Sequence, residues 1–234
     1  MTPYDRCHAV PTKLRVSSRL GERLKAETRT LHSEAERSPF MSALLRGRMN
    51  RDAYLALLHN LHAIYAALEP ALQRHAAHPA IALFHLASLA RTRSLRDDMA
   101  VLQEDQDPFA PDRLEPACTG YVRRLHALDS ASPGLLIAHA YVRYLGDLSG
   151  GQLLRSIVAR SLHLPPGVGT AFYDFGDAAA TAALTRAFRA AMERAVVDDE
   201  DELVAEAKRG FEWHRQLFDE LAMRFAIEAW DQNP

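Results

Sequence analysis

The chain has 234 residues, of which 48% are hydrophobic, and a formal net charge of −2. This length fits one large or two small domains, the apolar content is ample for a core, and the near-neutral charge gives no electrostatic case for a nucleic-acid partner. The sequence contains no run of about 18 apolar residues, so no membrane-spanning helix is predicted.

The first predicted segment is a flexible extension over residues 1–17, which lacks the apolar stretch of a signal peptide. Cys7 lies in this extension, and Cys118 is the only other cysteine of the sequence. Two isolated cysteines argue against a zinc ribbon or a disulfide framework and fit a reducing compartment. We therefore expect a soluble, cytoplasmic protein with no membrane partner.

From residue 18 onward, apolar residues recur at helical spacing almost everywhere. Asn50 can cap the third helix, and Pro70 is expected to kink or end it. The predicted helices of the first half are, in chain order, 18–37, 41–46, 50–70 and 78–103.

A proline-rich loop over 107–116 separates the two halves. Ser132 is predicted to cap a long helix whose first residue is Pro133, and the acidic run 198–202 suits the positive end of the last helix. The predicted helices of the second half are 117–128, 133–163, 179–195 and 199–229. No strand pattern competes, so the sequence predicts an all-α single domain over residues 18–230.

Three glycines, Gly146, Gly150 and Gly151, fall inside the predicted helix 133–163. Each costs roughly 1 kcal/mol relative to alanine in a helix interior. A sequence tolerates this cost where another group must lie very close to the backbone. We therefore predict a helix kinked over a flat ligand, which it touches with main chain and with the carboxylate of Asp147.

His32 is the most informative of the eleven histidines. Lys25 lies two helical turns before it and Glu36 one turn after it, so the three side chains share a helix face. A histidine that binds a metal through one nitrogen usually has a partner for the other nitrogen, and Glu36 can be that partner. The residues alone equally fit an ordinary His–Glu pair on a solvated face.

A carboxylate-bridged di-iron site is the rival chemistry for a helical bundle. Such a site needs Glu-x-x-His motifs, and no histidine of this chain has a glutamate three residues before it. The sequence also lacks a phosphate-binding glycine loop and the GxSxG and HExxH motifs.

Two segments carry a resemblance to a known family. Residues 24–36, LKAETRTLHSEAE, resemble the proximal helix of heme oxygenases, and residues 141–152, YVRYLGDLSGGQ, resemble their distal helix. The similarity continues through 63–69, 172–175 and 211–221, so it covers about residues 20–222.

This resemblance implies an all-α, single-domain heme oxygenase-like bundle with heme between the first helix and the distal helix. It implies cleavage of heme to biliverdin, carbon monoxide and ferrous iron, with heme as both cofactor and substrate. The reaction would use O2 and an external electron donor, which we expect to be a ferredoxin, a flavodoxin or a flavin reductase. We expect a monomer or a weak dimer.

The resemblance also assigns residues to the proximal side of the heme. His32 would be the axial ligand of the iron, with Glu36 as the partner of its second nitrogen. Lys25, Tyr141 and Arg189 would hold the heme propionates.

On the distal side, Gly146 and Gly150 would let the helix backbone approach the iron-bound oxygen. Asp147 would organise a water network there, with Arg143 one turn earlier as its partner. Tyr65 would belong to the same polar network.

The remaining assignments concern the apolar wall and the departures from the family pattern. Phe211 and Phe218 would form the wall. His214 stands where mammalian-type relatives carry a distal asparagine, and Thr185 stands where they carry a lysine that helps to seat the heme. Arg186 lies beside Thr185 and can substitute for that lysine from another direction. We expect the alpha isomer of biliverdin if heme is seated as in those relatives.

Two alternatives remain open at this point. One is a non-catalytic protein of the same fold that binds or sequesters heme. The other is a non-heme relative of the architecture, either a di-iron oxidase or a thiamin-degrading enzyme. The Gly-Asp-Leu-Ser-Gly-Gly segment and the missing Glu-x-x-His motifs disfavour the second alternative.

Overall fold

The computed structural model describes residues 20–84, 86–103 and 114–228. The predicted extension 1–17 and the start of the first helix at residue 18 lie outside these ranges. The end predicted for the last helix at residue 229 is wrong, because that helix ends at Arg224 and residues 225–228 are not helical. Every regular element in the described part is helical, which confirms the all-α prediction.

The helices of the first half are α1 Leu20–Glu36, α2 Pro39–Leu45, α3 Arg51–Arg74, α4 Leu86–Leu89 and α5 Thr92–Leu102. The predicted cap of α3 is confirmed, because the Asn50 side chain accepts a hydrogen bond from the Ala53 backbone N–H at 2.8 Å. Pro70 does not end α3, which continues to Arg74.

The single helix predicted for 78–103 is wrong. Residues 78–84 form turns, and the segment contains the short α4 and then α5. Glu69 of α3 accounts for the break before α5. Its Oε2 accepts hydrogen bonds from the backbone N–H of Thr92 at 3.2 Å and from the Thr92 hydroxyl at 2.6 Å. A distant carboxylate therefore fixes where α5 begins.

The second half contains α6 Pro116–Ala131, η2 Pro133–Leu135, α7 Leu136–Ser161, η3 Ala171–Tyr173, α8 Ala178–Arg194 and α9 Glu200–Arg224. Helix α7 passes through all three glycines without a break. The predicted cap at Ser132 is wrong, because its side chain makes no capping hydrogen bond and Pro133 opens a 3-10 turn instead. Asp199 caps α9 by accepting from the backbone N–H groups of Asp201 and Glu202.

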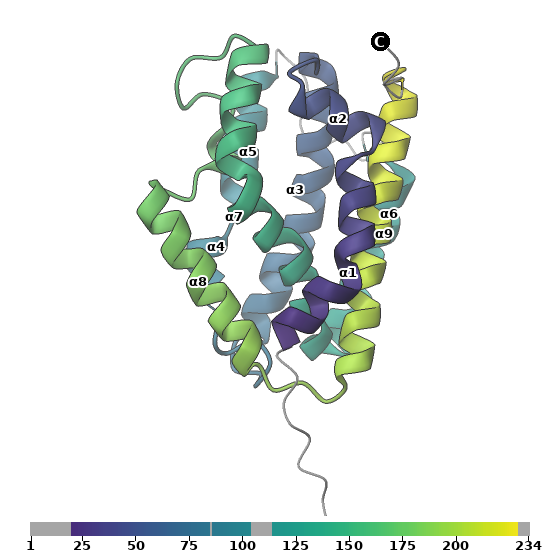
Figure 1. The fold of residues 1–234 in the computed structure, drawn as a ribbon, viewed down its shortest axis with the longest axis vertical. Helices are drawn as coiled ribbons and strands as arrows, with labels where there is room; N and C mark the ends of the chain where they lie inside the picture. Colours follow the sequence, from purple (N-terminus) through teal and green to yellow (C-terminus); the bar gives the residue numbers. More distant parts are fainter. Residues whose placement is uncertain (1–19, 85, 104–113, 229–234) are drawn as a thin grey trace, which may run out of the picture.

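The helices form a bundle in which α1, from the start of the described chain, packs along α9, from its end (Figure 1). Helix α3 packs against α5 and α6, and α7 packs against α8 and α9. Large aromatic side chains fill the centre, among them Tyr54, Tyr65, Tyr121 and Tyr144, which are almost completely buried. In Figure 1 helix α8 stands at the edge of the bundle, and it contacts α1 near the lower end of the view.

No helix within 20–84, 86–103 and 114–228 is long and apolar enough to span a bilayer.

Candidate active site

A cavity of about 630 Å³ opens between α1, α7, α8 and α9. Its size falls within the range of small-molecule and cofactor sites. The residues that line it are Gly21, Glu22, Lys25, Thr28, Arg29, His32, Glu36, Tyr141, Val142, Leu145, Gly146, Ser149, Gly150, Arg189, Met192, Glu193 and Phe211.

His32 lies on the α1 wall of this cavity. Its Nδ1 is 3.4 Å from Glu36 Oε2, and its ring meets the edge of Phe211 with a centroid distance of 5.7 Å. About half of the His32 side chain is exposed. Because Glu36 lies beside Nδ1, the other ring nitrogen, Nε2, remains as the candidate metal ligand.

Three cationic side chains, Lys25, Arg29 and Arg189, line the cavity from α1 and α8. None of them forms an ion pair with another residue of the described part. The hydroxyl of Tyr141 reaches the same region, 3.4 Å from the Thr28 hydroxyl. Burial raises the pKa of Tyr141, so the phenol is neutral near pH 7 and can donate a hydrogen bond.

Gly146 and Gly150 form the α7 wall. An added Cβ at either position would meet no heavy atom within 4 Å, because both glycines face the open cavity. Gly151 is different, since a Cβ there would lie 3.4 Å from the Tyr173 carbonyl oxygen. Two of the three glycines therefore face space for a ligand, and the third faces η3, which packs against α7.

A buried polar cluster lies behind the glycine wall. Arg143 donates through Nη2 to Asp147 Oδ1 at 3.0 Å, and the Tyr65 hydroxyl donates to Asp147 Oδ2. The Arg143 guanidinium also lies 5.3 Å from the centre of the Tyr65 ring. The carboxylate of Asp147 is therefore held on one side by α7 and on the other by α3.

His214 of α9 completes this cluster. Arg143 Nη1 donates to His214 Nε2 at 2.7 Å, and His214 Nδ1 donates to the Gly210 carbonyl at 2.8 Å. Burial and the neighbouring Arg143 charge hold the pKa of His214 well below its usual value. His214 is therefore a neutral imidazole in one tautomer, which helps to orient the guanidinium.

Two opposing effects set the pKa values in this cluster: burial disfavours the charged form of each group, and neighbouring opposite charges favour it. Burial raises the pKa of Asp147, and the Arg143 charge opposes that rise. Burial also raises the pKa of Tyr65. Although burial disfavours a guanidinium charge, the adjacent Asp147 carboxylate raises the pKa of Arg143 above its usual value. The cluster thus pairs a permanent cation with a carboxylate whose proton affinity is increased.

The structure brings most of the predicted site residues to one cavity. Those that line it are Lys25, His32, Glu36, Tyr141, Gly146, Gly150, Arg189 and Phe211. Asp147, Arg143, Tyr65 and His214 lie in the buried cluster behind it. Phe218 is outside the lining and stacks on Phe40 with a ring-centroid distance of 6.1 Å.

Some residues that line the cavity were not among the site residues predicted from the sequence. Arg29 lies one helical turn after Lys25 and Thr28 one turn before His32, so helical spacing alone could have placed both on the same face. Glu193 lies one turn after Arg189, so the same spacing places it on that face of α8, but its approach to α1 depends on how α8 packs.

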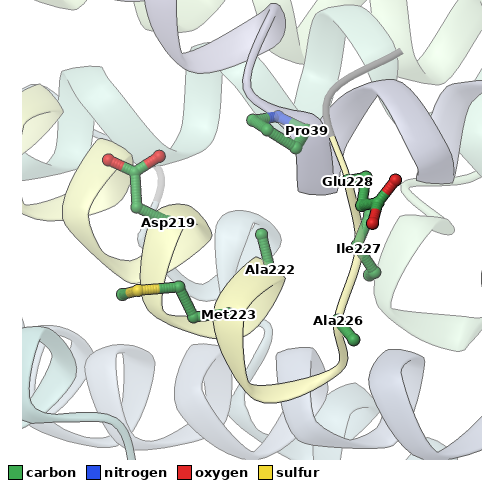
Figure 2. A pocket seen from close by; sticks show the side chains of 7 residues that line it. All are labelled: Pro39, Asp219, Ala222, Met223, Ala226, Ile227 and Glu228. Carbon is green, nitrogen blue, oxygen red and sulfur yellow. The ribbon is translucent and has the colours of Figure 1, made fainter.

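A second pocket, of about 350 Å³, lies at the end of α9 (Figure 2). Its lining consists of Pro39, Asp219, Ala222, Met223, Ala226, Ile227 and Glu228. This lining contains no histidine and no cationic side chain, so it offers neither an imidazole ligand for iron nor a cation that would pair with carboxylates. Nowhere among the described residues do three or more His, Cys, Asp or Glu side chains form a group that could hold a metal ion.

Comparison with known proteins identifies the family of this chain. The sequence model of the family described as "Heme oxygenase" matches residues 18–220. The chain belongs to the heme oxygenase family. It is 33% identical over 208 residues to heme oxygenase 1 of Nostoc sp., an alignment that covers 88% of this chain and 87% of the relative. It is 34% identical over 223 residues to human heme oxygenase 1, which covers 92% of this chain and 76% of the relative.

Solved structures of heme oxygenases have the same fold. The structure of heme oxygenase-1 from the cyanobacterium Synechocystis sp., in complex with heme, matches with a TM-score of 0.82 and 31% identity over 89% of this chain and 95% of that one. The heme oxygenase of Leptospira interrogans matches with a TM-score of 0.81 and 30% identity over 87% and 100% of the two chains.

The resemblance read from residues 24–36 and 141–152 is thus confirmed, and the chain is an enzyme of the heme oxygenase class. No finding favours the non-catalytic alternative.

Proposed function

We propose that this heme oxygenase binds heme in the cavity between α1 and α7 and cleaves it to biliverdin, carbon monoxide and ferrous iron. The observation that carries the proposal is the pairing of His32 on α1 with open-faced Gly146 and Gly150 on α7, all lining one cavity. One wall offers a metal ligand, and another offers bare backbone.

The residues present fit a heme. His32 would bind the iron through Nε2, with Glu36 fixing the ring through Nδ1. Lys25, Tyr141 and Arg189 would hold the propionates, because two of them are cations and the third is a neutral hydrogen-bond donor. Phe211 would contact the macrocycle from the proximal side, where it already touches the His32 ring.

Heme bound there would supply both the iron that activates O2 and the ring that is oxidised, with electrons from an external ferredoxin, flavodoxin or flavin reductase. The protein would keep acid–base side chains off the glycine wall. Asp147, held by Arg143 and Tyr65, is the nearby carboxyl that would hold and move protons, acting through ordered water.

The test is a reaction of the purified chain with hemin and an electron donor under air, followed by absorption spectroscopy. We expect loss of the heme bands and appearance of biliverdin. The His32→Ala variant should lose the spectral signature of axial histidine ligation, because no other histidine lines the cavity.

His126→Ala is the matched control, since His126 is exposed on α6 and does not line the cavity. It should keep both the spectrum and biliverdin formation. A stable oxygen-bound heme without biliverdin would favour a heme-binding protein. An unchanged spectrum in His32→Ala would refute the assignment of the axial ligand.

A further inference from the structure

The cavity is lined by glutamates as well as by cations. The proposed binding of a dianionic heme explains the cations but does not require the glutamates. Glu22 lies three residues before Lys25 on α1, and Glu193 lies four residues after Arg189 on α8. Residues at these spacings are neighbours on one helix face. Each cation proposed to hold a propionate therefore has a carboxylate one turn away on its own helix and in the same cavity.

Glu193 also lies against the opposite helix. Its Oε1 is 2.7 Å from the position that a Cβ would take at Gly21, in the first turn of α1. Gly21 leaves room for this carboxylate where it lies, and both Gly21 and Glu193 line the cavity. The Glu193 carboxylate therefore lies between α1, which carries Lys25, and α8, which carries Arg189.

A carboxylate in this place opposes the binding of other carboxylates. It attracts the same cations that the propionates would use, and it repels the propionates themselves. Within the described part, Glu193 has no ion-pair partner that would cancel its charge.

We propose that Glu193 is an affinity-setting residue that weakens the hold of the cavity on the carboxylates of its tetrapyrrole ligands, so that substrate exchanges and product leaves. This inference rests on the proposed function, because it takes heme and biliverdin as the ligands. Glu193 acts through charge and needs no contact with the reacting atoms.

The test is a titration of the full chain with ferric hemin and with biliverdin, at low and at high ionic strength. Glu193→Gln keeps the shape of the side chain and removes its charge. Because the groups are exposed, we expect both ligands to bind about two- to five-fold more tightly at low salt. The gain should shrink at high salt, as an interaction between exposed charges does. Biliverdin should also dissociate more slowly from the variant.

Two controls separate charge at the cavity from other causes. Glu34→Gln removes the same charge from α1 at an exposed position outside the lining, and it should leave both affinities unchanged. Hemin dimethyl ester has no free carboxylates, so Glu193→Gln should not improve its binding.

Unchanged or weaker hemin affinity in Glu193→Gln at low salt would overturn the inference, and so would an equal gain with the dimethyl ester. If either occurs while hemin still shows the axial-histidine spectrum that His32→Ala loses, only the role of Glu193 fails. If the unaltered chain shows no such spectrum, the proposed function fails as well.

Discussion

At the scale of single residues, Asp147 is the buried carboxylate at the centre of the polar cluster. Arg143 and Tyr65 each donate to one of its carboxylate oxygens, and His214 holds the far side of the guanidinium. Neutral His214 adds no positive charge, so Arg143 is the cation that pairs with the carboxylate, and Arg91 adds a weaker positive field. A single substitution at Asp147 should therefore separate heme binding from proton supply.

Asp147→Asn keeps the side-chain shape, keeps an oxygen acceptor and removes the carboxylate charge. Hemin should bind with near-normal affinity, because Asp147 does not line the cavity. Biliverdin formation should slow by roughly ten-fold or more, since proton supply by a positioned side chain contributes at least that much. Single-turnover absorption spectroscopy with saturating hemin measures this rate.

Asp97→Asn is the comparison variant, because Asp97 is an exposed carboxylate that pairs only loosely with Arg93, at 3.9 Å. It should behave like the unaltered protein. Biliverdin formation at the normal rate in Asp147→Asn would remove Asp147 from the mechanism.

At the scale of elements, α7 has glycines that serve different purposes on different faces. Gly146 and Gly150 face the cavity, and Gly151 faces η3. The helix remains continuous through all of them, so the packing of α7 with α8, α9 and η3 compensates for their low helix propensity.

Gly150→Ala should make the protein more stable and less active. The new methyl group points into open space, so the helix gains up to about 1 kcal/mol from the better propensity of alanine. The same methyl group would occupy the wall on which heme is proposed to lie, and biliverdin formation should fall. Urea unfolding and the hemin reaction measure the two effects.

Gly151→Ala is the matched partner of that variant on the same helix. Its methyl group would make an ordinary van der Waals contact with the Tyr173 backbone at 3.4 Å, away from the cavity. Gly151→Ala should therefore gain stability without a fall in biliverdin formation. Loss of stability in Gly150→Ala, or an equal fall of biliverdin formation in both variants, would contradict the distinction between the two glycines.

At the scale of the whole molecule, a buried ionic cluster joins three helices. Glu206 of α9 accepts from His139 of α7 at 2.9 Å and from Arg124 of α6 at 2.6 Å. Tyr121 of α6 donates to the other nitrogen of His139 at 2.9 Å. Although burial opposes its ionisation, these hydrogen bonds lower the pKa of Glu206 from 4.5 to about 2.

This cluster predicts loss of stability in acid. The folded-state pKa of Glu206 lies below its unfolded value, so its contribution is complete above about pH 4.5 and disappears as pH falls toward 2. Burial lowers the pKa of His139 as well, so the unfolded chain takes up the extra proton below about pH 6.5. Both groups therefore lower the free energy of unfolding as the pH drops. For Glu206 this loss of stability is on the order of 3 kcal/mol.

Urea unfolding between pH 7 and pH 3 measures this dependence. Glu206→Gln should be less stable at pH 7 and should show a flatter decline below pH 4.5. A decline as steep as that of the unaltered chain would assign the acid sensitivity to other carboxylates.

The sequence by itself determined the helical class, the family and eight of the seventeen residues that line the cavity. These features are local, because 3.6-residue periodicity places Lys25, His32 and Glu36 on one face and short motifs identify both walls. The same periodicity gave a wrong prediction for 78–103, where it indicated one helix and the structure has turns followed by α4 and α5.

Only the tertiary structure decided what depends on residues far apart in the chain. Glu69 of α3 hydrogen-bonds Thr92 at the start of α5. Tyr65 contacts Asp147, and His214 contacts Arg143. Glu193 of α8 lies against α1. The different surroundings of Gly150 and Gly151 also appear only in the folded chain. The physical reason is that packing between helices sets these contacts, and no local periodicity in the sequence records which helices meet.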